Sequence, residues 1–174
     1  SPSQQQAGTL PPVSTTPTPV PGLSTVSPGS GGPTTGFDTA KTGLDGYTPE
    51  SYGGSSFKKT VYRVQGKNLD DSGAAAVWVF TITLDNTSRL LTYDGNSWRD
   101  TIISPADLPA AIDFDQIISP AELFSRNQPT LLPADRTWVT RDLDLSNSVY
   151  IVTITSGNDR NVYRFNATTG VLIS

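Results

Sequence analysis

An internal repeat constrains the fold of this chain more than any other feature. Residues 77–98, VWVFTITLDNTSRLLTYDGNSW, align without a gap with residues 149–170, VYIVTITSGNDRNVYRFNATTG, at an offset of 72. Each copy reads as a β-branched and aromatic strand, a polar turn containing Asp-Asn or Gly-Asn, and a second alternating strand. We therefore expect two β-hairpins. The matching residues are Val77, Thr81, Ile82 and Thr83 in the first copy and Val149, Thr153, Ile154 and Thr155 in the second.

A further alternating segment precedes each hairpin. These segments, Lys59 to Leu69 and Arg136 to Leu145, have strand composition and are joined to the hairpins by short polar links. The sequence thus predicts an α+β fold of two tandem three-stranded antiparallel meanders, joined side by side into one six-stranded sheet, with short helices between them. We assign residues 1–36 to an extended arm, 37–103 to the first repeat and 104–174 to the second.

A shorter duplication, IISPADL at residues 102–108 and IISPAEL at residues 117–123, lies between the predicted meanders. Serine, proline and an acid three residues after the serine form a capping box with proline at the first helical position. Ser104 and Ser119 should therefore each begin a helix, and Pro109 should keep the first helix to about one turn. Leu123 and Phe124 would pack the second helix on the sheet.

The first strand of the first hairpin is apolar on both faces. Trp78, Phe80 and Ile82 point one way and Val77, Val79 and Thr81 the other, because side chains alternate along a strand. We expect both faces to be at least partly covered, and we interpret the aromatic residues as core rather than as a ligand site.

Residues 1–36 contain no charged residue and hold eight of the fourteen prolines. Such a stretch cannot bury enough apolar surface to offset its ordering entropy, so we expect an extended, partly polyproline II tether. In bacterial lipoproteins, a small residue and a polar, proline-rich tether come directly after the lipidated cysteine. We therefore expect a lipid-anchored, extracytoplasmic protein of the periplasm or cell surface, whose lipidated cysteine would precede Ser1.

The composition excludes many kinds of chemistry. The chain has no His, Cys or Met and a formal net charge of −4. Without Cys and His it lacks the thiolate nucleophile, the disulfide and the usual general base near neutral pH. The acidic balance argues against nucleic acid as a partner. No run of 18 apolar residues is present, so we expect no membrane-spanning segment. We expect no enzyme, no cofactor and no bound metal.

The end of the chain resembles the PepSY module. The residues that carry this resemblance are ISPAELF at 118–124, VYIVTIT at 149–155 and VYRFNATTG at 162–170, followed by VLIS. In that family a helix packs on antiparallel strands that finish in a Tyr-x-Val-Asp-Ala-x-Thr-Gly pattern. Ala167, Thr169 and Gly170 fit the pattern, whereas Asn166 replaces its aspartate. The resemblance covers residues 117–174 and, more faintly, residues 59–100. It implies an extracytoplasmic module that binds or restrains another protein and brings no catalytic residues.

The final turn has a structural interpretation from its residue types. Gly170 should adopt a positive φ, and Thr169 should bond the turn backbone. The turn would let Val171 to Ile173 complete a packed edge.

Several polar groups are candidate functional sites, and each can also be explained without a function. The pairs Asp113 with Asp115 and Asp142 with Asp144 could serve a glycosidase, but they also fit a solvated face. Residues 94–100, DGNSWRD, have oxygen ligands near calcium-loop spacing without the closing acid. Lys58 and Lys59 could act as a base, although no serine stands out as nucleophile. Asn86 and Asn166 lie in glycosylation sequons, which we attribute to chance.

We therefore expect a non-enzymatic accessory subunit or binding module that docks on a larger membrane or envelope protein complex, with respiratory and photosynthetic complexes as candidate hosts. The alternative is a PepSY-like module that inhibits a peptidase or acts as a propeptide. A third hypothesis, a carboxylate-dependent glycan enzyme, depends on Asp142 and Asp144.

Overall fold

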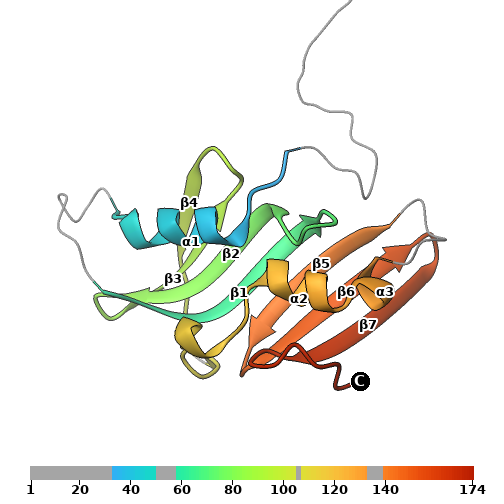
Figure 1. Ribbon diagram of the computed structural model, residues 1–174. Coiled ribbons are helices and arrows are strands. Elements are labelled where there is room, and N and C mark those ends of the chain that lie inside the picture. Colours follow the sequence, from blue (N-terminus) through green and yellow to red (C-terminus); the bar gives the residue numbers. More distant parts are fainter. Residues whose placement is uncertain (1–32, 50–57, 105–106, 133–138) are drawn as a thin grey trace, which may run out of the picture.

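The computed structural model describes residues 33–49, 58–104, 107–132 and 139–174. Within these ranges seven strands form one antiparallel sheet in the order β4-β3-β2-β1-β5-β6-β7, and short helices lie on one of its faces (Figure 1). The α+β class predicted from the sequence is confirmed, with most of the regular structure in the sheet. Residues 1–32 of the predicted arm lie outside the described residues.

The elements follow one another along the chain as a helix and four strands, then short helices and three strands. The strands are β1 (Lys59–Leu69), β2 (Ala75–Leu84), β3 (Thr87–Tyr93), β4 (Trp98–Ile102), β5 (Thr140–Ser146), β6 (Val149–Ser156) and β7 (Asp159–Asn166). The helices are α1 (Phe37–Gly46), the 3-10 helix η2 (Phe114–Gln116), α2 (Pro120–Arg126) and α3 (Gln128–Leu131).

Strand β4 and helix α1 lie where the sequence analysis predicted no element. Strand β4 adds a seventh strand, so the expectation of six is wrong by one edge strand. It pairs with β3 and stacks Trp98 on Tyr93, with 4.7 Å between the ring centroids. Helix α1 forms because Phe37, Ala40 and Leu44 recur at helical spacing and turn an apolar stripe toward the sheet. Both segments are short and polar enough to resemble loops in the sequence.

The predicted strand Lys59–Leu69 is confirmed as β1, whereas the predicted start of the fourth strand at Arg136 lies outside the described residues. The two hairpins have the same register. Trp78 lies opposite Tyr93 in the first, and Tyr150 lies opposite Phe165 in the second, which are positions 72 residues apart. At the tip of the first hairpin, Asp85 and Asn86 have positive φ values of 51° and 62°. Such values match the primed turns that suit the twist of a hairpin.

One strand pair joins the two meanders. Strands β1 and β5 are antiparallel, with Val64 opposite Leu145 and Gly66 opposite Leu143. Gly66 is needed here, because a Cβ at this position would lie 2.9 Å from Cζ3 of the Trp78 ring. The close approach of the indole to β1 therefore depends on the missing side chain.

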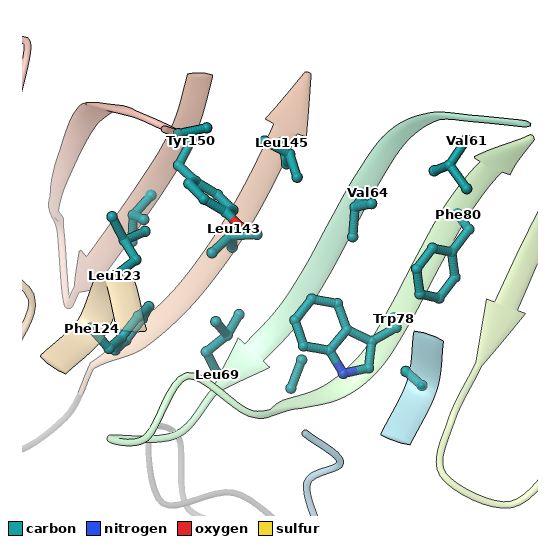
Figure 2. Packing of buried hydrophobic residues seen from close by; sticks show 14 of the residues in the cluster. Val61, Val64, Leu69, Trp78, Phe80, Leu123, Phe124, Leu143, Leu145 and Tyr150 are labelled. Carbon is teal, nitrogen blue, oxygen red and sulfur yellow. The ribbon is translucent and has the colours of Figure 1, made fainter. Parts of the chain in front are cut away.

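The core lies between the sheet and the helices. Figure 2 shows Trp78 and Phe80 in one half and Tyr150 with Leu123 in the other, with Val64 and Leu145 at the junction. The aromatic residues of β2 are fully buried, as predicted. The Tyr150 hydroxyl donates to the Ile118 carbonyl at 2.6 Å, and burial raises the pKa of this phenol.

The opposite face of the sheet differs from the expectation. Val77 and Val79 are half-buried there and Thr81 is buried, but none of the described helices lies over them (Figure 1). All of these helices pack on the Trp78 and Tyr150 side. The partial burial of these residues agrees with the expected partial cover, but no described helix provides it, and we call this side the open face.

Helix α2 begins as predicted. The Ser119 Oγ accepts a hydrogen bond from the Glu122 N–H at 3.1 Å, and Pro120 occupies the first turn. The second half of the capping box is replaced, because the Glu122 carboxylate pairs with Arg126 instead. The other predicted helix, after Ser104, falls partly on residues 105–106, outside the described chain. Residues 107–110 form no helix.

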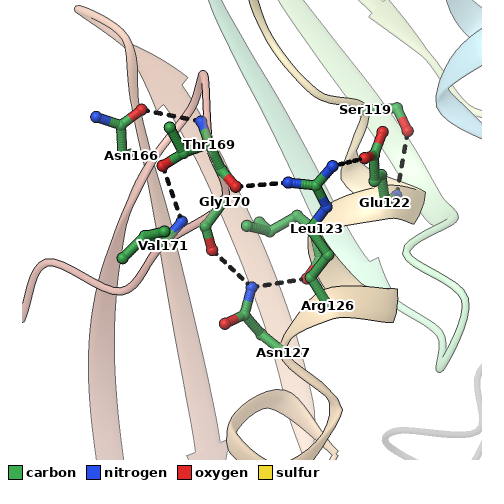
Figure 3. Close-up of polar contacts among 9 residues, drawn as sticks. All are labelled: Ser119, Glu122, Leu123, Arg126, Asn127, Asn166, Thr169, Gly170 and Val171. Atoms are coloured by element: carbon green, nitrogen blue, oxygen red, sulfur yellow. Dashed lines mark hydrogen bonds and ion pairs between the residues drawn. The ribbon is translucent and has the colours of Figure 1, made fainter.

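The C-terminal turn is held by α2 (Figure 3). Arg126 Nη1 donates to the Thr169 carbonyl at 2.7 Å, and Asn127 Nδ2 donates to the Gly170 carbonyl at 2.9 Å. Gly170 has a φ of +77°, and Thr169 Oγ1 accepts from the Val171 N–H, so both predicted roles are confirmed. Asn166 Oδ1 accepts hydrogen bonds from the N–H groups of residues 168 and 169, so this side chain stabilises the turn.

The last residues complete the sheet edge with their backbone alone. Residues 171–174 pair with β7 through Asn166 and Arg164. The side chains of Val171, Leu172 and Ile173 are 63%, 45% and 56% exposed. The prediction of a packed edge is therefore wrong for these side chains.

The end of the arm is bonded to the body. Thr35 forms a bridge with Ala75 at the start of β2, and its carbonyl accepts from the Trp78 indole N–H at 2.7 Å. Thr34 Oγ1 donates to Asp70 Oδ2 at 2.6 Å, while Asp70 Oδ1 accepts from Ser72 and Ala74. Burial alone would raise the pKa of Asp70, but hydrogen bonds from Thr34 and Ser72 hold it below its usual value.

Substituting Gly66 by alanine should destabilise the protein by about 1–3 kcal/mol, because the new methyl group meets the buried Trp78 ring. Gly46→Ala is the matched control, since its Cβ would meet nothing within 4 Å, and it should be neutral or stabilising by up to about 1 kcal/mol. Urea unfolding of the variants measures both. Equal stability of Gly66→Ala and the wild type would contradict the tight approach.

Substituting Asp70 by asparagine should lower stability at neutral pH more than in acid. The folded pKa of Asp70 lies below the ordinary value of 3.8, so its contribution is present above that value and is lost as pH falls through the folded pKa. The difference in unfolding free energy between wild type and variant should thus be larger at pH 7 than at about pH 2.5. An equal difference at both pH values would refute this role of Asp70.

Candidate functional site

The open face is the candidate functional surface. It is formed by alternate residues of all seven strands, because the antiparallel register places one row opposite the next. One such row crosses the whole sheet and consists of Arg99, Thr92, Val79, Gln65, Asp144, Ile151 and Arg164. Threonine, aliphatic and charged side chains therefore share a surface that the described helices leave uncovered.

A shallow hollow of about 480 Å³ lies on this face over β1, β5, β6 and β7. Its walls combine hydroxyl, aliphatic and charged groups. The residues that give the hollow this character include Lys67, Asp142, Asp144, Ile151, Thr153, Arg160, Val162 and Arg164.

The two carboxylates of the hollow are engaged by β1. Arg63 Nε donates to Asp144 Oδ1 at 3.0 Å, and its Nη2 donates to the second oxygen, so the pair is bidentate. The hydrogen bond to Asp144 is the main cause that raises the pKa of Arg63. The Asn68 N–H donates to Asp142 Oδ1 at 3.1 Å. Both aspartates therefore hold β5 to β1.

The cations of the hollow have no such partners. In the ranges that the structure describes, no ion pair or hydrogen bond joins the side chains of Lys67, Arg160 or Arg164 to another residue. Arg160 and Arg164 lie on the edge strand β7, exposed and four residues apart on the same face. The chain as a whole is acidic, so this cationic region has the opposite sign to the rest of the protein.

The structure places one of the two acid pairs that the sequence offers on the open face. Asp142 and Asp144 share the open face, as the spacing predicted. Arg63 donates to both oxygens of Asp144, so this carboxylate belongs to an ion pair between strands. Asp113 and Asp115 lie elsewhere, at η2, where Asp113 accepts from the Asp115 N–H. The glycan-enzyme hypothesis stays a prediction.

The residues with calcium-loop spacing do not converge. Asp94 Oδ1 accepts from the N–H groups of Asn96 and Ser97, which lower the pKa of Asp94. Asp100 lies on the helix side, where its Oδ2 accepts from Arg89 at 2.8 Å and from the Tyr47 hydroxyl at 3.0 Å. In the described part of the chain, no three His, Cys, Asp or Glu residues are grouped so that they could hold a metal ion.

The remaining candidates have structural surroundings. The Lys59 ammonium donates to the Asp45 carbonyl at 3.2 Å, and burial lowers its pKa, whereas Lys58 is exposed. Asn86 lies at the exposed tip of the β2–β3 hairpin, and Asn166 holds the C-terminal turn.

Sequence reasoning missed the cations of the open face. The signal is present in β7, where arginines recur at positions 160 and 164 with Val162 between them, all on one strand face. It is informative only once the neighbouring strands, and the face without helices, are known.

Among the described residues, no helix has the length and apolar character that crossing a membrane requires.

Comparisons with known proteins do not assign the chain to a family. No family model matches it, and no curated protein matches it. A solved structure, the crystal structure of a putative lipoprotein from Clostridium difficile 630, is similar with a TM-score of 0.49 and 13% identity. The similarity covers 81% of this chain and 91% of that chain. A likeness of this degree carries no functional argument, and the PepSY relationship stays a prediction.

Proposed function

We propose that this chain is a non-enzymatic, extracytoplasmic binding module that docks on a larger protein complex through the open face of its sheet. The observation that carries the proposal is that no described helix covers this face, although it bears Val77, Val79 and Ile151 among its polar residues. Mixed aliphatic, hydroxyl and charged groups on one broad surface are typical of protein interfaces.

The arm acts as a tether in this proposal. Residues 1–36 carry no charge and hold many prolines, and a lipidated cysteine before Ser1 would fix the far end to a membrane. The near end is bonded to the body through Thr35 and Ala75. A tether raises the effective concentration of the body near a membrane complex without adding contacts.

The order of elements supports a tandem origin. A helix precedes a meander in each half, with α1 before β1–β3 and α2 before β5–β7, and the two hairpins share their register. We propose that the halves arose by duplication of a PepSY-like unit. The division at residues 103 and 104 belongs to this proposal.

A peptidase-inhibiting module is the second candidate, and the turn formed by Asn166, Thr169 and Gly170 is the observation that favours it. Titration against secreted metallopeptidases separates the two. Inhibition at micromolar concentration would favour this alternative over a docking subunit.

Filling the open face should abolish docking. Thr153 lies on the open face in β6 and in the hollow, so Thr153→Trp adds bulk there without changing charge. Co-purification from native membranes should fall by about tenfold or more. Ser125→Trp, on the exposed side of α2, is the matched control and should bind like the wild type. Equal binding of both variants and the wild type would refute docking through this face.

Removing residues 1–32 should weaken membrane association and leave the body intact, because the contacts of Thr34 and Thr35 are kept. We expect at least about a fivefold loss in co-purification, since the tether supplies effective concentration. The unfolding midpoint should not change. Removing residues 1–36 should lower that midpoint as well, and unchanged association after the shorter deletion would refute the tether.

A further inference from the structure

We propose that the docking partner presents an extended, carboxylate-bearing segment, with acidic residues four positions apart and an apolar residue midway, which lies along β6 and β7. This inference rests on the proposed function and adds the chemistry of the partner.

The charge of the hollow indicates that the partner carries negative charge. Asp144 is neutralised by Arg63, and Asp142 accepts from the Asn68 N–H, whereas the cations of the hollow have no partner among the described residues. An approaching group therefore meets net positive charge at Arg160 and Arg164. Arginine binds carboxylates in bidentate geometry.

The spacing of the two arginines indicates that the bound segment of the partner is extended. Arg160 and Arg164 are four residues apart on one strand face, which corresponds to about 13 Å along the strand. A second extended segment running along β7 has the same repeat, so its side chains at positions i and i+4 would face the two arginines. Val162 lies between them, is 43% exposed and is flanked across the strand by Thr153. An apolar residue at position i+2 would cover it.

Other occupants of the hollow fit its charge less well or can be told apart from the proposed segment. The chain's own arm has no charged residue and cannot pair with these arginines. Nucleic acid is disfavoured by the net charge of −4. A second copy of this acidic chain and an anionic lipid surface share the sign of the proposed segment, so binding measurements must separate them.

The test uses the full chain and a peptide probe of sequence Thr-Glu-Thr-Val-Thr-Glu-Thr with blocked ends, followed by amide chemical shifts. We expect shifts concentrated in β6 and β7, and binding that weakens with salt. Arg160→Glu with Arg164→Glu should weaken binding by about tenfold or more, and Arg160→Gln with Arg164→Gln should weaken it less. Both arginines are exposed, and circular dichroism checks that the variants fold.

The matched control is Lys41→Glu with Lys58→Glu, which makes the same change in net charge away from the hollow. It should bind the probe within about twofold of the wild type. If both charge-reversed proteins lose the same amount of probe affinity, binding depends on the net charge of the protein rather than on the two arginines, and the proposal is overturned. Equal binding of a peptide with the two glutamates adjacent would overturn the spacing.

Further outcomes separate this inference from the proposed function. If the probe does not bind but Thr153→Trp still abolishes co-purification, the carboxylate segment is refuted and the docking face stands. If the probe does not bind and Thr153→Trp leaves co-purification unchanged, both the carboxylate segment and the docking face are refuted. Binding to phosphatidylglycerol vesicles that displaces the probe would overturn the proposal and assign the arginines to a lipid surface. Sedimentation of a dimer that the arginine reversal disrupts would overturn it in favour of a second copy.

Discussion

The pairing of β1 with β5 is the interaction on which the rest of the structure depends. It joins two meanders into one sheet, and its register sets the face of every strand on both sides. Gly66, opposite Leu143 in this pairing, also lets the Trp78 ring of β2 lie close to β1, where a side chain would otherwise be. A slip of one residue would turn Leu143 and Leu145 outward and separate the two halves of the core.

The same register divides the molecule into two unlike faces. On the helix side, α1 and α2 cover aromatic and aliphatic residues, so burial of apolar surface stabilises the fold there. On the open face, Arg63 of β1 donates to Asp144 of β5, which strengthens the junction and neutralises a surface carboxylate. The side chains of Arg160 and Arg164 form no ion pair or hydrogen bond with another described residue, so they contribute positive charge to the hollow. This is why the partner we propose is acidic.

The two ends of the described chain are fixed by hydrogen bonds rather than by burial. Thr34 and Thr35 are bonded to Asp70, Ala75 and Trp78, so a pull on the arm would act on β2 in the centre of the first meander. At the other end, Arg126 and Asn127 hold the final turn while the side chains after it stay exposed.

The sequence by itself determined the local structure: the strand Lys59–Leu69, the shared strand-turn-strand units, the Ser119 cap and the left-handed Gly170. These depend on alternation, turn chemistry and capping, which act over a few residues. It could not give β4, the side on which the helices lie, or the partners of Asp142 and Asp144. Those depend on contacts between residues such as Arg63 and Asp144, 81 positions apart, so only the tertiary structure decided which charges of the described chain are paired.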